Sequence, residues 1–176
     1  MHYGTIKFND IANGEGVRVS LFVSGCSNHC KECFNPETWN FEYGKPFTAE
    51  TEKIILDALK SDFVNGLTLL GGEPFEPRNQ KELLPLVKKV RTMYPNKTIW
   101  AYSGFRLEDE LLKEGCYANC EHTLEILKNI DILVDGRFDR DLRDIRLNFR
   151  GSSNQRIILV QESLKAGKVV LSPLNN

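Results

Sequence analysis

Apolar residues gather into short runs along the chain, separated by amphipathic segments and by turns rich in Gly, Asn and Pro. Runs that are rich in Val, Ile, Leu and aromatic residues, and that end at such turns, predict buried β-strands. These runs lie at residues 5–8, 18–23, 67–70, 98–102, 132–134 and 156–161, with a weaker one at 168–171. The amphipathic segments between them predict helices.

Helical spacing of apolar residues sets the expected helices. Thr48 is a suitable N-cap for the first of them, because its hydroxyl can accept a hydrogen bond from the first turn. A proline in a helix interior costs about 3 kcal/mol, so we expect the regular part of the second helix to start near Pro85. The expected helices lie at residues 48–60, 80–93, 106–113 and 121–129.

Strands that alternate with helices predict an α/β fold with a mainly parallel sheet. The units are too few for a closed eight-stranded barrel. A chain of 176 residues fits one domain, 1–176, that buries roughly 70% of the surface of its unfolded chain. Because ligands bind at the carboxyl ends of parallel strands, functional residues are expected in the loops that follow the strands.

Composition narrows the classes of function. A net charge of -1 argues against a broad nucleic-acid-binding face, and residues 137–150 carry arginines interleaved with Asp139, Asp141 and Asp144, which indicates a polar docking or solvated segment. The first residues lack the pattern of a signal peptide, and no apolar window is long enough to span a membrane. Five cysteines, an odd number, form a poor disulfide framework, so we expect a reducing, cytoplasmic location and no membrane partner.

Three of the five cysteines crowd into residues 24–35, the cysteine loop, directly after the strand 18–23. Cys26, Cys30 and Cys33 have the spacing C-x3-C-x2-C. A structural zinc site needs four ligands, whereas an iron-sulfur cubane held by three thiolates keeps one iron free for an outside ligand. The alternative is a structural zinc site or an electron-transfer cluster that a remote thiol, Cys116 or Cys120, completes.

Several polar residues and glycines follow the other strands. Gly71-Gly72-Glu73-Pro74 comes after the strand 67–70, and two residues without side chains let backbone carbonyls approach an ammonium group. Ser103, after the next strand, is either a contact for a hydroxyl group of a cofactor or a turn residue. Asp135 and Arg137 bind cofactor or partner, or form a surface ion pair.

The cysteine spacing followed by Gly-Gly-Glu resembles the signature of the radical S-adenosylmethionine (SAM) enzymes. Within this superfamily the chain is most similar to the activating enzymes of anaerobic (class III) ribonucleoside-triphosphate reductases. The likeness covers most of the chain. It is carried by residues 13–18 (NGEGVR), 21–26 (LFVSGC), 35–39 (NPETW), 66–74 (GLTLLGGEP), 100–105 (WAYSGF), 135–138 (DGRF) and 150–156 (RGSSNQR).

The resemblance implies an open partial (β/α) barrel that holds a 4Fe-4S cluster on Cys26, Cys30 and Cys33, with SAM bound at the free iron. It places Gly72 at the methionine amino group, with Gly71 and Glu73 as neighbours. It also places the backbone of Glu32, Cys33 and Phe34 against the adenine end. Many relatives have an aromatic residue or a glycine where this chain has Glu32, so only a backbone contact carries over there. No side chain is expected to act as a general acid or base.

The resemblance also implies the reaction and the partners. One electron, from a donor such as reduced flavodoxin, cleaves SAM to methionine and a 5'-deoxyadenosyl radical, which removes a hydrogen atom from a glycine of the reductase. Three alternatives stay open: an activase for another glycyl-radical enzyme such as pyruvate formate-lyase, a small-molecule enzyme such as a deazaguanine synthase, and a non-catalytic iron-sulfur or zinc module. Cys116 and Cys120 are either two ordinary thiols or a second metal site, and His29 is expected to point away from the cluster.

Overall fold

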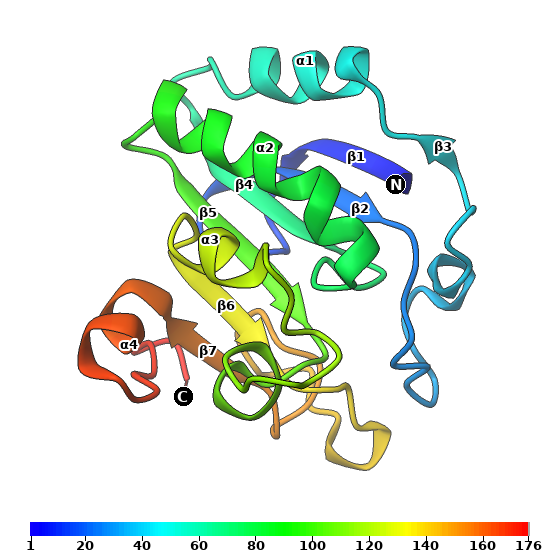
Figure 1. The fold of residues 1–176 in the computed structure, drawn as a ribbon, viewed down its shortest axis with the longest axis vertical. Coiled ribbons are helices and arrows are strands. Elements are labelled where there is room, and N and C mark those ends of the chain that lie inside the picture. Colours follow the sequence, from blue (N-terminus) through cyan, green and yellow to red (C-terminus); the bar gives the residue numbers. More distant parts are fainter. Residues whose placement is uncertain (176) are drawn as a thin grey trace.

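The computed structural model describes residues 1–175, so the last residue of the expected domain 1–176 lies outside the described part. Within residues 1–175, seven strands form one sheet in the order β3-β1-β2-β4-β5-β6-β7 (Figure 1). The strands are β1 (His2–Asp10), β2 (Val17–Val23), β3 (Lys45–Pro46), β4 (Val64–Gly71), β5 (Thr98–Ser103), β6 (Ile132–Asp135) and β7 (Arg156–Leu159).

The centre of the sheet is parallel and its edges are antiparallel. Strands β2, β4, β5 and β6 pair in parallel, which confirms the expected α/β class. At the edges, β1 runs antiparallel to β2 and β3, and β7 runs antiparallel to β6. The expectation of a mainly parallel sheet therefore holds only for the middle of the sheet. The connection from β1 to β2 is too short for a parallel crossover. The sheet is open, with β3 and β7 as its edges.

The helices agree with the expected pattern in place but not always in extent. Thr48 caps the first helix as expected, since its hydroxyl accepts from the backbone N–H of Thr51 at 3.3 Å. No helix within residues 1–175 is long and apolar enough to cross a membrane. The α-helices are α1 (Ala49–Ala58), α2 (Pro77–Met93), α3 (Thr123–Leu127) and α4 (Val160–Ala166), and the other turns are η1 (Pro36–Trp39), η2 (Leu107–Leu111) and η3 (Arg140–Leu142).

The expected start of α2 near Pro85 is wrong. The helix begins at Pro77, where the missing N–H of proline is no loss, and continues through Pro85. Pro85 is exposed, so water can reach the carbonyl that its ring leaves without a partner. Burial of Leu83 and Leu86 on the other face holds the two halves of the helix against the sheet.

Three expectations near the C-terminal half also need correction. The expected helix 106–113 is a single π-helical turn, in which the carboxylate of Glu110 accepts from the backbone N–H of Arg106 at 2.8 Å. Strand β7 ends at Leu159, and α4 follows it until Gly167, which ends the helix in the left-handed conformation (φ 64°). The weak strand at 168–171 is only a single bridge to Ile158.

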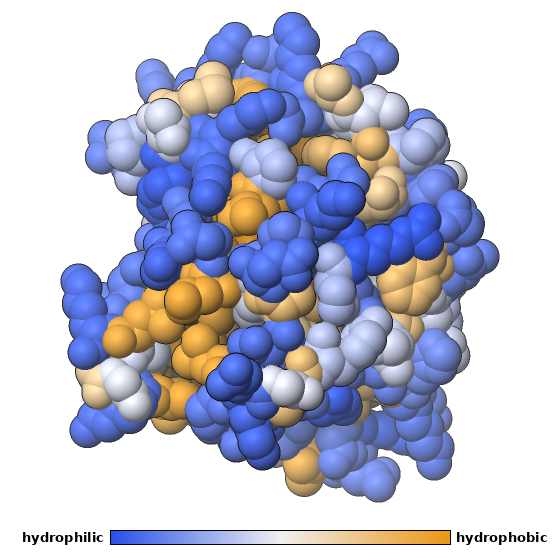
Figure 2. Space-filling view, in the orientation of Figure 1, coloured by the Kyte–Doolittle hydropathy of each residue, from blue (hydrophilic) through white to orange (hydrophobic). Residues whose placement is uncertain are grey.

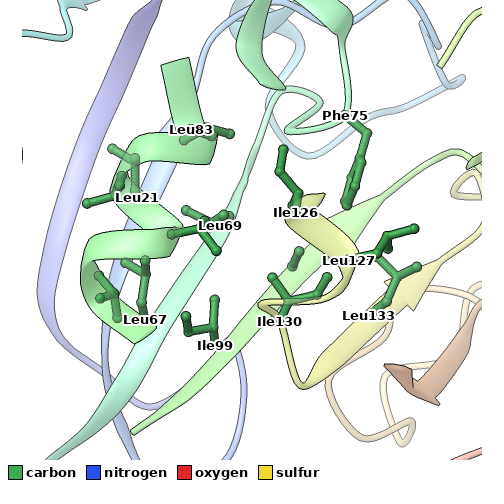
Figure 3. Close-up of a cluster of buried hydrophobic side chains, with 14 of the residues drawn as sticks. Leu21, Leu67, Leu69, Phe75, Leu83, Ile99, Ile126, Leu127, Ile130 and Leu133 are labelled. Carbon is green, nitrogen blue, oxygen red and sulfur yellow. The ribbon is translucent and has the colours of Figure 1, made fainter. Parts of the chain in front are cut away.

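The main core lies between the sheet and the helices α1, α2 and α3, which share one face of the sheet (Figure 1). Alternate residues of the strands, such as Leu21, Leu67 and Ile99, meet Leu83 of α2 and Ile126 of α3 there (Figure 3). The outer surface of this side is largely hydrophilic, with apolar side chains gathered near α3 and α4 (Figure 2). The opposite face of the sheet carries a second, smaller buried cluster around Trp100.

A fully buried arginine organises that opposite face. The guanidinium of Arg18, on β2, donates to Thr68 Oγ1 at 2.6 Å, to the carbonyl of Leu67 at 2.8 Å and to the carbonyl of Thr98 at 2.9 Å. It also lies 5.4 Å from the ring centre of Trp100. Burial lowers the pKa of Arg18 to about 10, which leaves the side chain charged at neutral pH. Arg18 thus ties three central strands together.

Replacing Arg18 by alanine is expected to lower the free energy of unfolding by about 3 kcal/mol or more, because it opens a cavity and leaves buried carbonyl and hydroxyl groups without a donor. Urea denaturation followed by circular dichroism measures this loss. Arg146→Ala is the matched control, since its side chain is 87% exposed. If both variants unfold within about 0.5 kcal/mol of the unmodified protein, Arg18 does not hold the strands together.

Candidate functional site

A cavity of about 430 Å³ lies at the carboxyl end of the central strands. Its wall combines the cysteine loop, the glycine motif at 71–73, residues 102–104 at the carboxyl end of β5, and parts of the segment 136–155 between β6 and β7. Parallel strands bring these loops to the same edge of the sheet, as the sequence predicted. The volume falls in the range of cofactor and small-molecule sites, about 300–1,000 Å³.

All three loop cysteines line this cavity. Cys26 is 9% exposed, whereas Cys30 and Cys33 are half-buried. The backbone N–H of Cys33 donates to the carbonyl of Cys30 at 3.1 Å, and Glu32 takes the left-handed conformation (φ 56°) that this tight turn requires. Across residues 1–175, no group of three or more His, Cys, Asp or Glu side chains is already placed to hold a metal ion.

Burial controls the chemistry of the thiols. It raises the pKa of Cys26 to about 12, and Glu73 nearby adds to the shift. Burial also raises the pKa of Cys30. Both groups are therefore protonated thiols at neutral pH, and a metal that binds them must displace their protons.

In the reduced, metal-free protein, we expect Cys26 to be alkylated at least about tenfold more slowly than Cys116 at pH 8, because only the thiolate reacts and Cys26 is both buried and protonated. The rate at Cys26 should keep rising with pH up to its raised pKa. Mass spectrometry of peptides after timed alkylation gives both rates. Equal rates at the two cysteines would contradict the burial of Cys26.

Glu73 joins three sides of the cavity. Its carboxylate is 1% exposed and accepts from Asn28 Nδ2 of the cysteine loop at 2.9 Å, from Ser103 Oγ at 2.9 Å, and from the backbone N–H groups of Gly104 at 2.7 Å and Phe75 at 2.9 Å. Burial raises the pKa of Glu73 to about 7, although these donors favour the ionised form. Glu73 thus fixes the cysteine loop to the ends of β4 and β5.

The two glycines of the motif are required by close packing. Gly71 has φ 104°, and a Cβ atom there would lie 2.8 Å from the backbone of Phe22. A Cβ atom at Gly72 would lie 2.6 Å from the carbonyl oxygen of Gly25. The backbone N–H of Gly72 donates to the carbonyl of Val23 at 2.7 Å. The motif therefore packs directly against the base of the cysteine loop, which leaves its backbone at the cavity wall.

Three buried polar atoms in the cavity wall have no partner within the described protein: Asn28 Oδ1, Trp39 Nε1 and the hydroxyl of Tyr102. Buried polar groups without a partner are rare, because leaving one unpaired costs about 1–3 kcal/mol. They supply one acceptor, one donor and one hydroxyl to whatever fills the cavity. Together with three thiols, this donor set fits a metal cluster with a polar organic ligand beside it.

Most of the expected cofactor-binding residues lie at the cavity, but their side chains differ in availability. Phe34 lines the wall and is 62% exposed, with its ring 5.0 Å from that of Phe138. Ser103 also lines it, yet its hydroxyl is occupied by Glu73 and by the backbone N–H of Phe105. Glu32 does not line the cavity, since its carboxylate forms an ion pair with Arg140 at 2.7 Å.

The remaining candidates lie outside the cavity. Cys116 contacts the carbonyl of Asp109 at 3.4 Å, and Cys120 accepts weakly from Thr123, so neither thiol joins the cysteine loop. The ring of His29 stacks on that of Trp39, with their centres 4.7 Å apart.

Asp135 and Arg137 both form ion pairs, but the surface ion pair that was the alternative describes only Arg137. Asp135 is fully buried and accepts from Arg156 Nε at 2.8 Å and from the backbone N–H of Leu107. Arg137 pairs with Glu110 at 2.7 Å.

Sequence reasoning missed several residues of the site. Asn28, Trp39 and Tyr102 lie within the cysteine loop and the stretches 35–39 and 100–105, but nothing in the sequence singled them out as cavity residues. Glu76, two residues after the glycine motif, accepts from the cysteine loop, and its place just before a helix was the one available signal. Residues 137–150 were interpreted as a polar docking or solvated segment, but Phe138 and Phe149 line the cavity.

Comparisons with known proteins agree with this geometry. The sequence profile of the 4Fe-4S single cluster domain matches residues 12–158. An anaerobic ribonucleoside-triphosphate reductase-activating protein of Enterobacteria phage T4 is 40% identical over 157 residues, which cover 89% of this chain and 93% of that protein. Proteins of the same name from Pasteurella multocida and Escherichia coli K12 are 43% and 41% identical, and the matches cover 89% and 88% of this chain and 96% of each relative.

These matches span nearly the full length of both chains and include the cysteine loop, the glycine motif and the loops after β5 and β6. The profile match alone covers most of the chain, from the turn before β2 to β7. The chain therefore belongs to the 4Fe-4S single cluster domain family and, within it, to the family of the anaerobic ribonucleoside-triphosphate reductase-activating proteins.

Proposed function

We propose that this chain activates an anaerobic ribonucleoside-triphosphate reductase by generating a glycyl radical on it. Cys26, Cys30 and Cys33 would hold one 4Fe-4S cluster, and SAM would bind beside it. The observation that carries the proposal is the near full-length similarity to activating proteins of such reductases, in a chain whose three loop cysteines line one cavity. The unpaired polar atoms in the same wall support an organic ligand next to the cluster.

When bound, the reduced cluster and SAM supply a 5'-deoxyadenosyl radical that removes a hydrogen atom from a glycine. The chain itself binds and orients. We propose that the backbone of Gly72 receives the methionine amino group, next to Gly71 and Glu73, since close packing leaves no room for a side chain at either glycine. Cys33, Phe34 and the backbone of Glu32 would face the adenine end, and the ion pair of Glu32 with Arg140 leaves that backbone contact open.

The open edge of the sheet supports a protein substrate. We propose that the sheet is an open partial (β/α) barrel of the radical SAM type and that residues 1–176 form one such domain. The cavity is bounded on one side by the segment 136–155, so a flexible glycine segment of a partner could reach the cysteine loop past Phe34 and Phe138. Ser103 contributes mainly by holding Glu73 in place.

The remaining parts of the proposal concern the electron donor and the cellular compartment. An electron donor such as reduced flavodoxin would reduce the cluster, because the cleavage of SAM consumes one electron. The free thiols of all five cysteines suit a reducing compartment such as the cytoplasm.

Electron paramagnetic resonance tests this function directly. The anaerobically reconstituted chain is mixed with the reductase of the same organism, SAM and dithionite, and we expect a glycyl doublet together with stoichiometric 5'-deoxyadenosine. Omission of SAM is the control and should abolish both. A doublet on pyruvate formate-lyase in place of the reductase would identify the other activase function, and a protein that binds zinc and forms no 5'-deoxyadenosine would be a non-catalytic module.

A further inference from the structure

A second buried glutamate holds the cysteine loop at Ser27, next to the contact that Glu73 makes with Asn28. Glu76 precedes α2 and is fully buried. Its Oε1 accepts from the backbone N–H of Ser27 at 2.7 Å and from the hydroxyl of the same residue at 2.6 Å. Its Oε2 accepts from the hydroxyl of Tyr117 at 2.7 Å. Three donors therefore converge on the carboxylate of Glu76, and two of them belong to Ser27, the residue after Cys26.

Buried amide side chains in the first turn of α2 hold the contact between Glu76 and the cysteine loop in place. Asn79 Nδ2, one turn into α2, donates to the carbonyl of Ser24 at 3.0 Å, and Gln80 Nε2 donates to the carbonyl of Ala118 at 2.8 Å. Both amides are buried. The first turn of α2 thus joins the base of the cysteine loop to the segment that carries Tyr117, and neither side can shift without breaking buried hydrogen bonds.

Glu76 is also a buried carboxylate with no cationic side chain paired to it. Within residues 1–175, no Lys, Arg or His side chain forms an ion pair with it. The hydrogen bonds reach it from one backbone N–H and two hydroxyl groups, so its two oxygens share three partners. In a buried site, a carboxylate acts on neighbouring groups more strongly than it does in water.

We propose that Glu76 is a positioning residue that fixes the backbone beside Cys26 and lowers the reduction potential of the cluster held by the cysteine loop. This inference rests on the proposed function, because it assumes that the three thiols hold a 4Fe-4S cluster. The potential of such a cluster depends on nearby charge and on hydrogen bonding, and a buried carboxylate disfavours the added electron. The cluster needs a low reduction potential in order to reduce the sulfonium of SAM.

The test compares Glu76→Gln with Glu82→Gln in the full chain after anaerobic reconstitution. Glu82 is an exposed residue of α2, the helix that follows Glu76, and provides the same substitution away from the loop. Midpoint potentials are measured by redox titration followed by electron paramagnetic resonance, without reductase or SAM. We expect a positive shift of the potential for Glu76→Gln and none for Glu82→Gln. A Glu76→Gln cluster with full iron content and an unshifted potential overturns the inference.

If Glu76→Gln fails to retain iron, the variant Tyr117→Phe tests the positioning role of Glu76 instead. This variant keeps the carboxylate and removes only one donor, so iron should be lost to a chelator several-fold faster than from the unmodified protein. Equal rates of loss would overturn the positioning role. If the unmodified chain assembles no 4Fe-4S cluster, the proposed function and this inference fall together; if it does and the variants match the control, only the inference falls.

Discussion

Alanine variants of Cys26, Cys30 and Cys33 are expected to lose nearly all of their iron after anaerobic reconstitution. Each removes one of the three thiols that line the cavity, and two thiolates cannot hold a cubane. Iron should fall from about four atoms per chain to below about one, and the yield of glycyl radical should fall by about 100-fold or more. Iron and sulfide assays, together with the visible absorbance of the cluster, measure the loss.

Cys116→Ala and Cys120→Ala are the matched controls. Both thiols lie outside the cavity, and their contacts are with Asp109 and Thr123. We therefore expect these variants to keep the iron content and absorbance of the unmodified protein. Loss of iron from either one would mean that a fourth thiol caps the cluster, which would close the position proposed for SAM.

Replacing Glu73 by alanine is expected to lower the free energy of unfolding by about 3–5 kcal/mol. The substitution leaves buried donors on Asn28, Ser103, Gly104 and Phe75 without an acceptor at once. Because Asn28 belongs to the cysteine loop, the metal-free loop should also become more accessible, and Cys26 should be alkylated faster. Urea denaturation under reducing conditions gives the stability.

Two further variants separate the role of Glu73 from a general effect of substitution. Glu73→Gln keeps one carbonyl acceptor but points an amide group at other donors. Its stability should therefore lie between that of the unmodified protein and that of Glu73→Ala. Glu82→Ala, on the exposed face of α2, should change stability by less than about 0.5 kcal/mol. A Glu73→Ala protein as stable as Glu82→Ala would show that the carboxylate does not join the loops.

Local patterns predicted the central part of the fold. The runs of apolar residues at 18–23, 67–70 and 98–102 lie inside β2, β4 and β5, since a strand covered on both faces needs an almost continuous apolar run. Parallel pairing then explains why the cysteine loop and the glycine motif meet at one edge.

Contacts between distant segments were not predictable in the same way. The π-turn at Leu107 depends on a carboxylate of Asp135 that only the sheet brings near. Helix α4 was missed because Val160 continues the apolar run of β7, although Gly167 marked a helix end.

The same limit applies to the site. The sequence indicated the three thiols and both glycines, because each belongs to a spaced motif. It could not indicate that Glu73 would accept from Ser103, or that Glu76 would accept from Ser27 and Tyr117, since these pairs are far apart in the chain. Nor does a polar segment such as 136–155 reveal which of its aromatic residues turn inward.

Mössbauer spectroscopy of the protein loaded with ⁵⁷Fe tests the central claim most directly, that three thiols hold a 4Fe-4S cluster whose remaining iron binds SAM. The account predicts that adding SAM changes the signal of one iron and leaves the others as they were. A spectrum in which all irons are unaffected by SAM, with a full complement of cluster, would contradict it.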